Sequence, residues 1–118
     1  MRNAGLRIQN SRGYIQVLTT AASRKDARRI AALLVRERLA ACVQVLGPIT
    51  STYCWKGGIE TTREWLCLAK TRKSLFTQVE SAIRDVHPYE VPEILALPVV
   101  AGSLAYLDWL DRETRRDD

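Results

Sequence analysis

The sequence predicts one α+β domain whose segments follow the order βαββαβ, with a short helix at the end. Two segments repeat apolar residues at helical spacing, four are rich in β-formers, and a glycine pair joins the two longest β-rich segments. With 118 residues, 47% hydrophobic and 26% charged, the chain has the composition of an ordinary globular domain. Its longest apolar runs, such as residues 94–97, are far shorter than the roughly 20 residues of a membrane helix.

The first strand and the first helix are predicted in the N-terminal third. Residues 14–20 are β-rich and alternate loosely, which is typical of a strand. Ser23 is followed three residues later by Asp26, a capping-box pattern that predicts a helix start. The helix continues to about Arg38, because apolar residues recur at helical spacing and the basic residues lie mostly off that stripe, which consists of Ala27, Ile30, Ala31, Leu34 and Val35.

A long β-hairpin is predicted next. Its first strand extends from Ala40 to Trp55 and is interrupted at Gly47-Pro48, where a bulge, a bend or an edge is expected because proline cannot donate a ladder hydrogen bond. The turn is Lys56-Gly57-Gly58, since glycine accepts the positive φ that such turns need. The second strand extends from about Ile59 to Lys70. Alternation places one set of side chains on a common face: Ile49, Ser51, Tyr53 and Trp55.

The remaining predicted elements are a second amphipathic helix, a fourth strand and a short terminal helix. Thr71 is expected to cap this helix, which ends near His87 because the following proline disfavours helical backbone. Its stripe consists of Leu75, Phe76, Val79, Ala82, Ile83 and Val86. A fourth strand is predicted over Glu93 to Val100. After the break at Gly102-Ser103, a short terminal helix carries Leu104, Leu107, Trp109 and Leu110.

This order is that of a ferredoxin-like antiparallel sheet with both main helices on one face. The third strand is apolar on both of its sides, with Trp65, Cys67 and Ala69 on one and Leu66 and Leu68 on the other. The monomer has helices for only one face, so the second apolar face predicts a homo-oligomer. The expected organisation is a flexible leader over 1–13, the domain over 14–112 and a charged tail over 113–118.

Charge and cysteine content narrow the function classes. The net charge of +5 comes from dispersed basic residues, which favours a solvated surface over nucleic-acid binding. The leader over 1–13 lacks the apolar core of a secretory signal. The chain has three cysteines, an odd number, and no C-x-x-C pair among Cys42, Cys54 and Cys67. We therefore expect a cytoplasmic protein with reduced thiols. The thiols are either soft metal ligands or, as apolar neighbours favour, small buried side chains. No hydrolase, zincin or phosphate-loop motif is present, and we expect no enzyme and no organic cofactor.

Two groups of residues are candidates for binding. His87, the only histidine, has Glu90 and Glu93 nearby, and imidazole with carboxylate oxygens suits Cu²⁺. The alternative is a histidine whose hydrogen bonds fix the Pro88 corner. Cys42 is a further candidate ligand.

A cleft beside His87 is expected from a second group, Tyr53, Trp55, Lys70 and Tyr89. Lys70 ends an apolar strand, so its charge requires solvent, an acidic partner or an anionic ligand. Glu93 is the candidate for the acidic partner. For the tryptophan, interface packing is the alternative.

Several separated motifs resemble one family. Residues 39–42 (Leu-Ala-Ala-Cys), 53–57 (Tyr-Cys-Trp-Lys-Gly), 70–71 (Lys-Thr) and 87–94 (His-Pro-Tyr-Glu-Val-Pro-Glu-Ile) stand in the order seen in CutA-like divalent-cation tolerance proteins. The match covers about Tyr14 to Arg112, and Cys42 falls on the Ala-Ala-Cys position of that family. The resemblance implies a compact homotrimer whose hairpins wrap neighbouring subunits, with an architecture related to PII-like trimers. It also implies a link to divalent-metal tolerance, with copper most often named, and animal relatives are linked to anchoring of an acetylcholinesterase.

Two functions therefore remain open. One is a copper or other divalent-metal tolerance protein that binds the ion weakly. The other is a PII-like sensor or scaffold that binds a small anion between subunits and signals to a protein partner not identified by the sequence. An RNA-binding domain of the same fold is disfavoured, because residues 63–68 hold one aromatic and no Gly-Phe pair. We expect neither a nucleic-acid nor a membrane partner.

Overall fold

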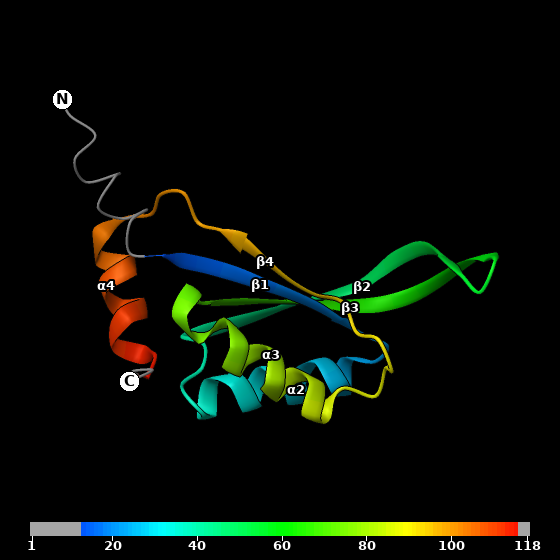
Figure 1. Ribbon diagram of the computed structural model, residues 1–118, viewed down its shortest axis with the longest axis horizontal. Coiled ribbons are helices and arrows are strands. Elements are labelled where there is room, and N and C mark those ends of the chain that lie inside the picture. The colour runs from blue at the N-terminus through cyan, green and yellow to red at the C-terminus, as the bar shows by residue number, and fades with distance from the viewer. Residues whose placement is uncertain (1–12, 116–118) are drawn as a thin grey trace.

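The computed structural model describes residues 13–115. Their elements follow the predicted order: β1 (Tyr14–Ala21), α2 (Arg24–Arg36), β2 (Cys42–Trp55), β3 (Gly58–Arg72), α3 (Phe76–Val86), β4 (Ile94–Pro98) and α4 (Leu104–Glu113). The strands form one antiparallel sheet in the order β2-β3-β1-β4 (Figure 1). The predicted α+β class, the βαββαβ order along the chain and the antiparallel sheet are confirmed.

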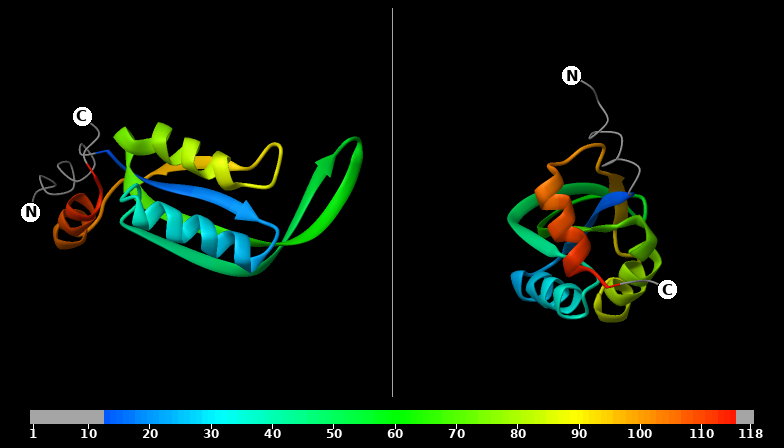
Figure 2. Two further views of the ribbon diagram at one scale, coloured as in Figure 1. Left: turned by 90° about the horizontal axis from the view of Figure 1, so that it is seen from below. Right: turned by 90° about the vertical axis from the view of Figure 1, so that its left-hand side faces the viewer.

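Helices α2 and α3 cover one face of the sheet (Figures 1 and 2). The Ser23 hydroxyl accepts a hydrogen bond from the Asp26 amide at 3.0 Å, so the predicted cap of α2 is confirmed. The core between sheet and helices joins the α2 stripe to inward side chains of β1 and β3, and its buried members include Ile15, Val17, Ile30, Leu34, Cys67, Ala69, Val79 and Ile83.

Helix α4 covers one end of the sheet, where Leu107 and Leu110 pack against Tyr14 and Ala41 in a second apolar cluster (Figure 1). Packing continues past the expected domain limit at residue 112, since Thr114 is buried and the Arg115 amide donates to the Arg38 carbonyl oxygen at 2.8 Å. The expected leader over 1–13 and tail over 113–118 fall mostly outside the described residues.

Two expected boundaries were wrong. Thr71 does not cap a helix, because it belongs to β3 and its hydroxyl donates to the buried Leu39 carbonyl oxygen at 2.6 Å. Helix α3 instead follows a 3₁₀ turn, Lys73–Leu75, without a side-chain cap. Strand β4 is shorter than predicted, because its ladder with β1 stops at the pair Ile15–Pro98 and the chain then turns toward α4.

The β2–β3 hairpin projects well beyond the helices (Figure 1). Its register shifts by one residue between Leu46 and Ile49, so the bulge predicted at Gly47-Pro48 is confirmed. A Cβ on Gly47 would lie 2.4 Å from Trp65 Cδ1, and therefore only glycine fits against this ring.

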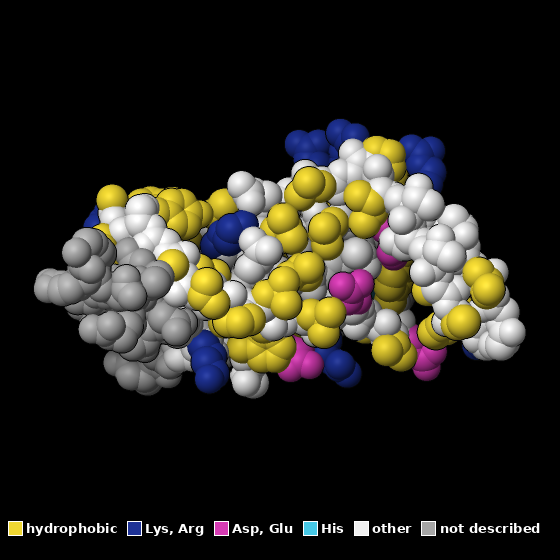
Figure 3. All heavy atoms as spheres, turned by 90° about the horizontal axis from the view of Figure 1, so that it is seen from above, with side chains coloured by type: hydrophobic (Ala, Val, Ile, Leu, Met, Phe, Trp, Pro, Cys, Tyr) yellow, Lys and Arg dark blue, Asp and Glu magenta, His cyan; other side chains and the backbone are white. Residues whose placement is uncertain are grey.

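The sheet face opposite α2 and α3, called the open face, carries apolar side chains that no described residue covers fully. Leu18, Leu66 and Leu68 are half-buried there, and Leu46, Leu95 and Leu97 are 47%, 55% and 48% exposed. Figure 3 shows hydrophobic side chains gathered over this part of the sheet. The predicted two-sided apolar character of β3 is thus confirmed. Among the described helices, none is long and apolar enough to cross a membrane.

Candidate functional site

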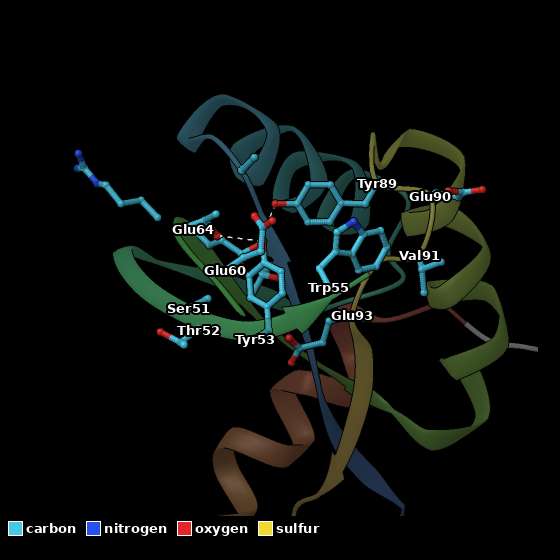
Figure 4. A pocket seen from close by; sticks show the side chains of 14 residues that line it. Ser51, Thr52, Tyr53, Trp55, Glu60, Glu64, Tyr89, Glu90, Val91 and Glu93 are labelled. Carbon is cyan, nitrogen blue, oxygen red and sulfur yellow. Dashed lines mark hydrogen bonds between the residues drawn. The ribbon is translucent and has the colours of Figure 1, made fainter. Parts of the chain in front are cut away.

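A pocket of about 700 Å³ lies between the hairpin and the segment that connects α3 to β4 (Figure 4). Directly opposed residues of an antiparallel pair share one face of the sheet. The ladder opposes Ser51 to Thr62 and Tyr53 to Glu60, so one hairpin face supplies both aromatic and acidic side chains. The connecting segment adds Tyr89, Glu90, Val91 and Glu93.

Glu64 is the most buried carboxylate in this pocket, with 7% of its surface exposed. The Tyr89 hydroxyl donates to Glu64 Oε2 at 2.8 Å, which joins the connecting segment to β3 (Figure 4). Burial raises the pKa of the Tyr89 phenol well above its usual range, and the hydrogen bond and negative charge of Glu64 raise it further. Glu64 and Tyr89 thus place a carboxylate and a phenol, joined by a hydrogen bond, in the inner part of the pocket.

Both ring nitrogens of His87 are used by the backbone. Nε2 donates to the Thr20 carbonyl oxygen at 2.6 Å, and Nδ1 accepts from the Tyr89 amide at 3.1 Å. His87 is 8% exposed, and its ring lies 4.7 Å, centroid to centroid, from the ring of Tyr89. These two hydrogen bonds hold the corner after α3, which is the structural role of His87 considered as the alternative to metal binding. A metal ion at His87 would have to displace one of them.

The other candidate metal ligands are separated. Glu90 and Glu93 both line the pocket, although Glu90 points away from its centre in Figure 4. Cys42 is opposite Lys70 in the β2–β3 ladder, near the α4 end of the sheet and beside Tyr106. Across residues 13–115, no group of three or more His, Cys, Asp or Glu side chains is placed to hold a metal ion. One chain therefore does not assemble the set His87, Glu90, Glu93 and Cys42.

The three free thiols differ in exposure. Cys67 is buried, and its Sγ donates to the Ala27 carbonyl oxygen at 3.6 Å. Cys42 is half-buried, whereas Cys54 is exposed. The expectation of buried thiols was wrong for Cys54, because the hairpin carries it beyond the layer of helices.

The expected cleft is assembled only in part. Tyr53, Trp55 and Tyr89 line one pocket as expected, but Lys70 lies elsewhere and donates to Gln44 Oε1 at 2.8 Å. Lys70 is opposite Gln16 of β1, whereas Ile94 is opposite Thr19, about 10 Å further along the strand. Glu93, which precedes Ile94, is therefore not the partner of Lys70 within one chain.

Sequence reasoning missed the acidic half of the pocket. Glu60 and Glu64 were not candidates, yet with Glu90 and Glu93 they give the pocket four lining carboxylates against one lining cation, Arg63, while Lys56 Nζ lies 5.9 Å from the centroid of the Trp55 ring. One signal was available, because Glu64 continues the strand face that carries Leu66 and Leu68. A carboxylate in such a row requires a polar partner or ligand.

The fold and the site together define a class: a small α+β protein with an acidic, aromatic-lined pocket beside an uncovered apolar sheet face. The CutA1 divalent ion tolerance protein family matches residues 15–113. The chain is 46% identical to the divalent-cation tolerance protein CutA of Thermus thermophilus, over 83% of this chain and 95% of that protein. It is 38% identical to a crystal structure of CutA1 from Oryza sativa, with a TM-score of 0.86 over 88% of this chain and 95% of that one. The chain belongs to the CutA1 divalent ion tolerance family.

Some relatives in this family are longer. Protein CutA of Homo sapiens is 46% identical over 86% of this chain, but the match covers 60% of the human protein. The chain thus spans about three fifths of that relative's length.

Proposed function

We propose that this chain is a homotrimeric divalent-cation tolerance protein that takes part in the response to metal ions and binds copper or a similar divalent ion weakly. The observation that carries this proposal is the charge of the pocket, whose lining includes four glutamates and one arginine. Such a field concentrates cations and disfavours anions. Family membership supports the same conclusion, whereas the acidic pocket argues against the small anion of a PII-like sensor.

The proposed ligands are the carboxylates of Glu93 and Glu90 at the rim of the pocket. Among divalent first-row metals, Cu²⁺ binds such oxygen sites most tightly. His87 has the role of a positioning residue, because its two hydrogen bonds hold the segment that carries both glutamates. Binding is weak in one chain, since three ligands do not converge there, and a second subunit would supply further donors.

The proposed trimer is supported by the open face. Leu46, Leu95 and Leu97 are about half exposed on it, next to a hairpin that projects beyond the helices. Burial of these side chains against other copies would stabilise the assembly by about 25 cal/mol per Å² of apolar surface. With unpaired cysteines, a reducing cytoplasm is the proposed location. A protein partner would respond to the metal-bound state of the trimer. No catalytic step is proposed.

The proposal is tested by thermal unfolding with ligand panels. A Cys54→Ser background is used, because this exposed thiol would bind copper on its own. A ligand at 100 times its Kd stabilises the native state by about 2.7 kcal/mol. We expect the midpoint to rise with Cu²⁺, to rise less with Mg²⁺ or Ca²⁺, and to remain unchanged with nucleotides or citrate. A rise with the anions and none with Cu²⁺ would favour the PII-like function instead.

A further inference from the structure

We propose that the inner part of the pocket, formed by Tyr53, Trp55, Glu64 and Tyr89, binds an organic cation with an alkylammonium or guanidinium group. The inference begins with Glu64, a residue that is only 7% exposed and that forms no ion pair with any described residue. Within residues 13–115, its one hydrogen bond comes from the neutral hydroxyl of Tyr89, and only Oε2 takes part. A buried carboxylate of this kind is costly unless a cation compensates its charge.

The surroundings of Glu64 favour an organic cation over a metal ion. Tyr53 and Trp55 are 40% and 46% exposed, and with Tyr89 they line the same pocket (Figure 4). The negative faces of such rings attract ammonium and guanidinium groups and also contact the attached alkyl chain. A divalent ion requires several converging oxygen ligands, which no three carboxylates of the described chain provide.

The size of the pocket agrees with this ligand class. Its volume of about 700 Å³ lies within the range of roughly 300–1,000 Å³ that is usual for small-molecule sites. Glu60 adds a second carboxylate from the same face of the hairpin, opposite Tyr53 in the ladder. The site thus combines a buried anion, a second acidic group and aromatic walls.

The organic cation has two possible sources. It is either a free small molecule, such as a primary amine or a guanidine, or the lysine or arginine side chain of a second copy of this chain. Both sources have the same chemistry, and both require the charge of Glu64. The inference does not depend on the proposed metal ligands, which are Glu90 and Glu93 at the rim, although both proposals draw on the negative charge of the pocket.

The test uses n-butylammonium chloride as the probe, with 1-butanol and butyrate as the neutral and anionic analogues of the same length. Binding to the full chain is followed by tryptophan fluorescence, because Trp55 lines the pocket, and a Trp55→Phe variant identifies its part of the signal. The decisive variant is Glu64→Gln, which removes the charge and keeps an oxygen to accept the Tyr89 bond. Glu80→Gln on the surface of α3 is the matched control.

We expect saturable binding of butylammonium but not of its analogues, a loss of at least tenfold with Glu64→Gln, and no change with Glu80→Gln. If a second copy supplies the cation, Glu64→Gln instead weakens self-association by the same factor in sedimentation, and Glu80→Gln does not. The inference is overturned if butyrate or butanol binds as well as butylammonium. It is also overturned if Glu64→Gln matches the control in both measurements. Cu²⁺ titration of Glu64→Gln separates this inference from the proposed function, since metal binding at Glu90 and Glu93 would remain.

Discussion

Replacement of Tyr89 by phenylalanine tests whether the Tyr89–Glu64 hydrogen bond holds the pocket together. The substitution removes one hydroxyl and leaves a buried carboxylate without the donor that now lies 2.8 Å away. A hydrogen bond to a charged group contributes about 1.5–3 kcal/mol. Because Glu64 is only 7% exposed, water replaces the donor poorly, and we expect the free energy of unfolding to fall by about 2 kcal/mol.

The matched control is Tyr53→Phe, which removes the same atom from another tyrosine of the same pocket. The Tyr53 hydroxyl is 3.4 Å from Thr62 Oγ1 at an exposed site, so its loss should change stability by less than about 0.5 kcal/mol. Urea unfolding is measured at one fixed protein concentration, because oligomer stability depends on concentration. Equal losses in the two variants would refute the reasoning. So would an unchanged effect of Tyr89→Phe in a Glu64→Gln background, where the charge is absent.

Three further predictions follow from the fold. Gly47→Ala should destabilise the protein by about 1–3 kcal/mol, because its Cβ would lie 2.4 Å from the Trp65 ring; a neutral effect in urea unfolding would contradict the bulge geometry. Burial raises the pKa of the Cys67 thiol from 9.0 to about 11, so the unfolded chain loses this proton first and stability falls as pH rises from about 9 to 11. In a Cys67→Ala variant, the free energy of unfolding should fall less over this pH range. Identical pH slopes of the parent and the variant would contradict this prediction. Leu95→Lys should dissociate a species that sediments near three times 13.3 kDa, and an unaffected assembly would place the interface elsewhere.

Local chemistry made much of the fold predictable. The Ser23–Asp26 capping pattern located the start of α2, because the cap and the helical stripe act over a few residues. Gly47-Pro48 located the bulge, since proline cannot complete the ladder. Thr71 was misjudged for the opposite reason: its hydroxyl bonds to Leu39, 32 residues away, and that contact has no local signature.

The site was predictable only where its residues are close in sequence. Residues 89–93 form one side of the pocket, and the sequence singled out three of them. Glu60 and Glu64 come from β3, far away in the sequence, and their position depends on the hairpin register, which the one-residue bulge shifts. The expected Lys70–Glu93 pair failed for the same reason, because the ladder places Lys70 further along the sheet, next to Gln44.

The central claim, divalent-cation binding at the rim of the acidic pocket, is tested most directly by calorimetric titration of Cu²⁺ into the Cys54→Ser protein. The decisive variant is Glu90→Gln with Glu93→Gln, which removes two rim charges. Its control is Glu80→Gln with Asp85→Asn, the same change on the α3 surface. We predict weak saturable binding in the parent and in the control, and a loss of at least tenfold in the rim variant. Equal Cu²⁺ affinities in the rim variant and the control would contradict the claim.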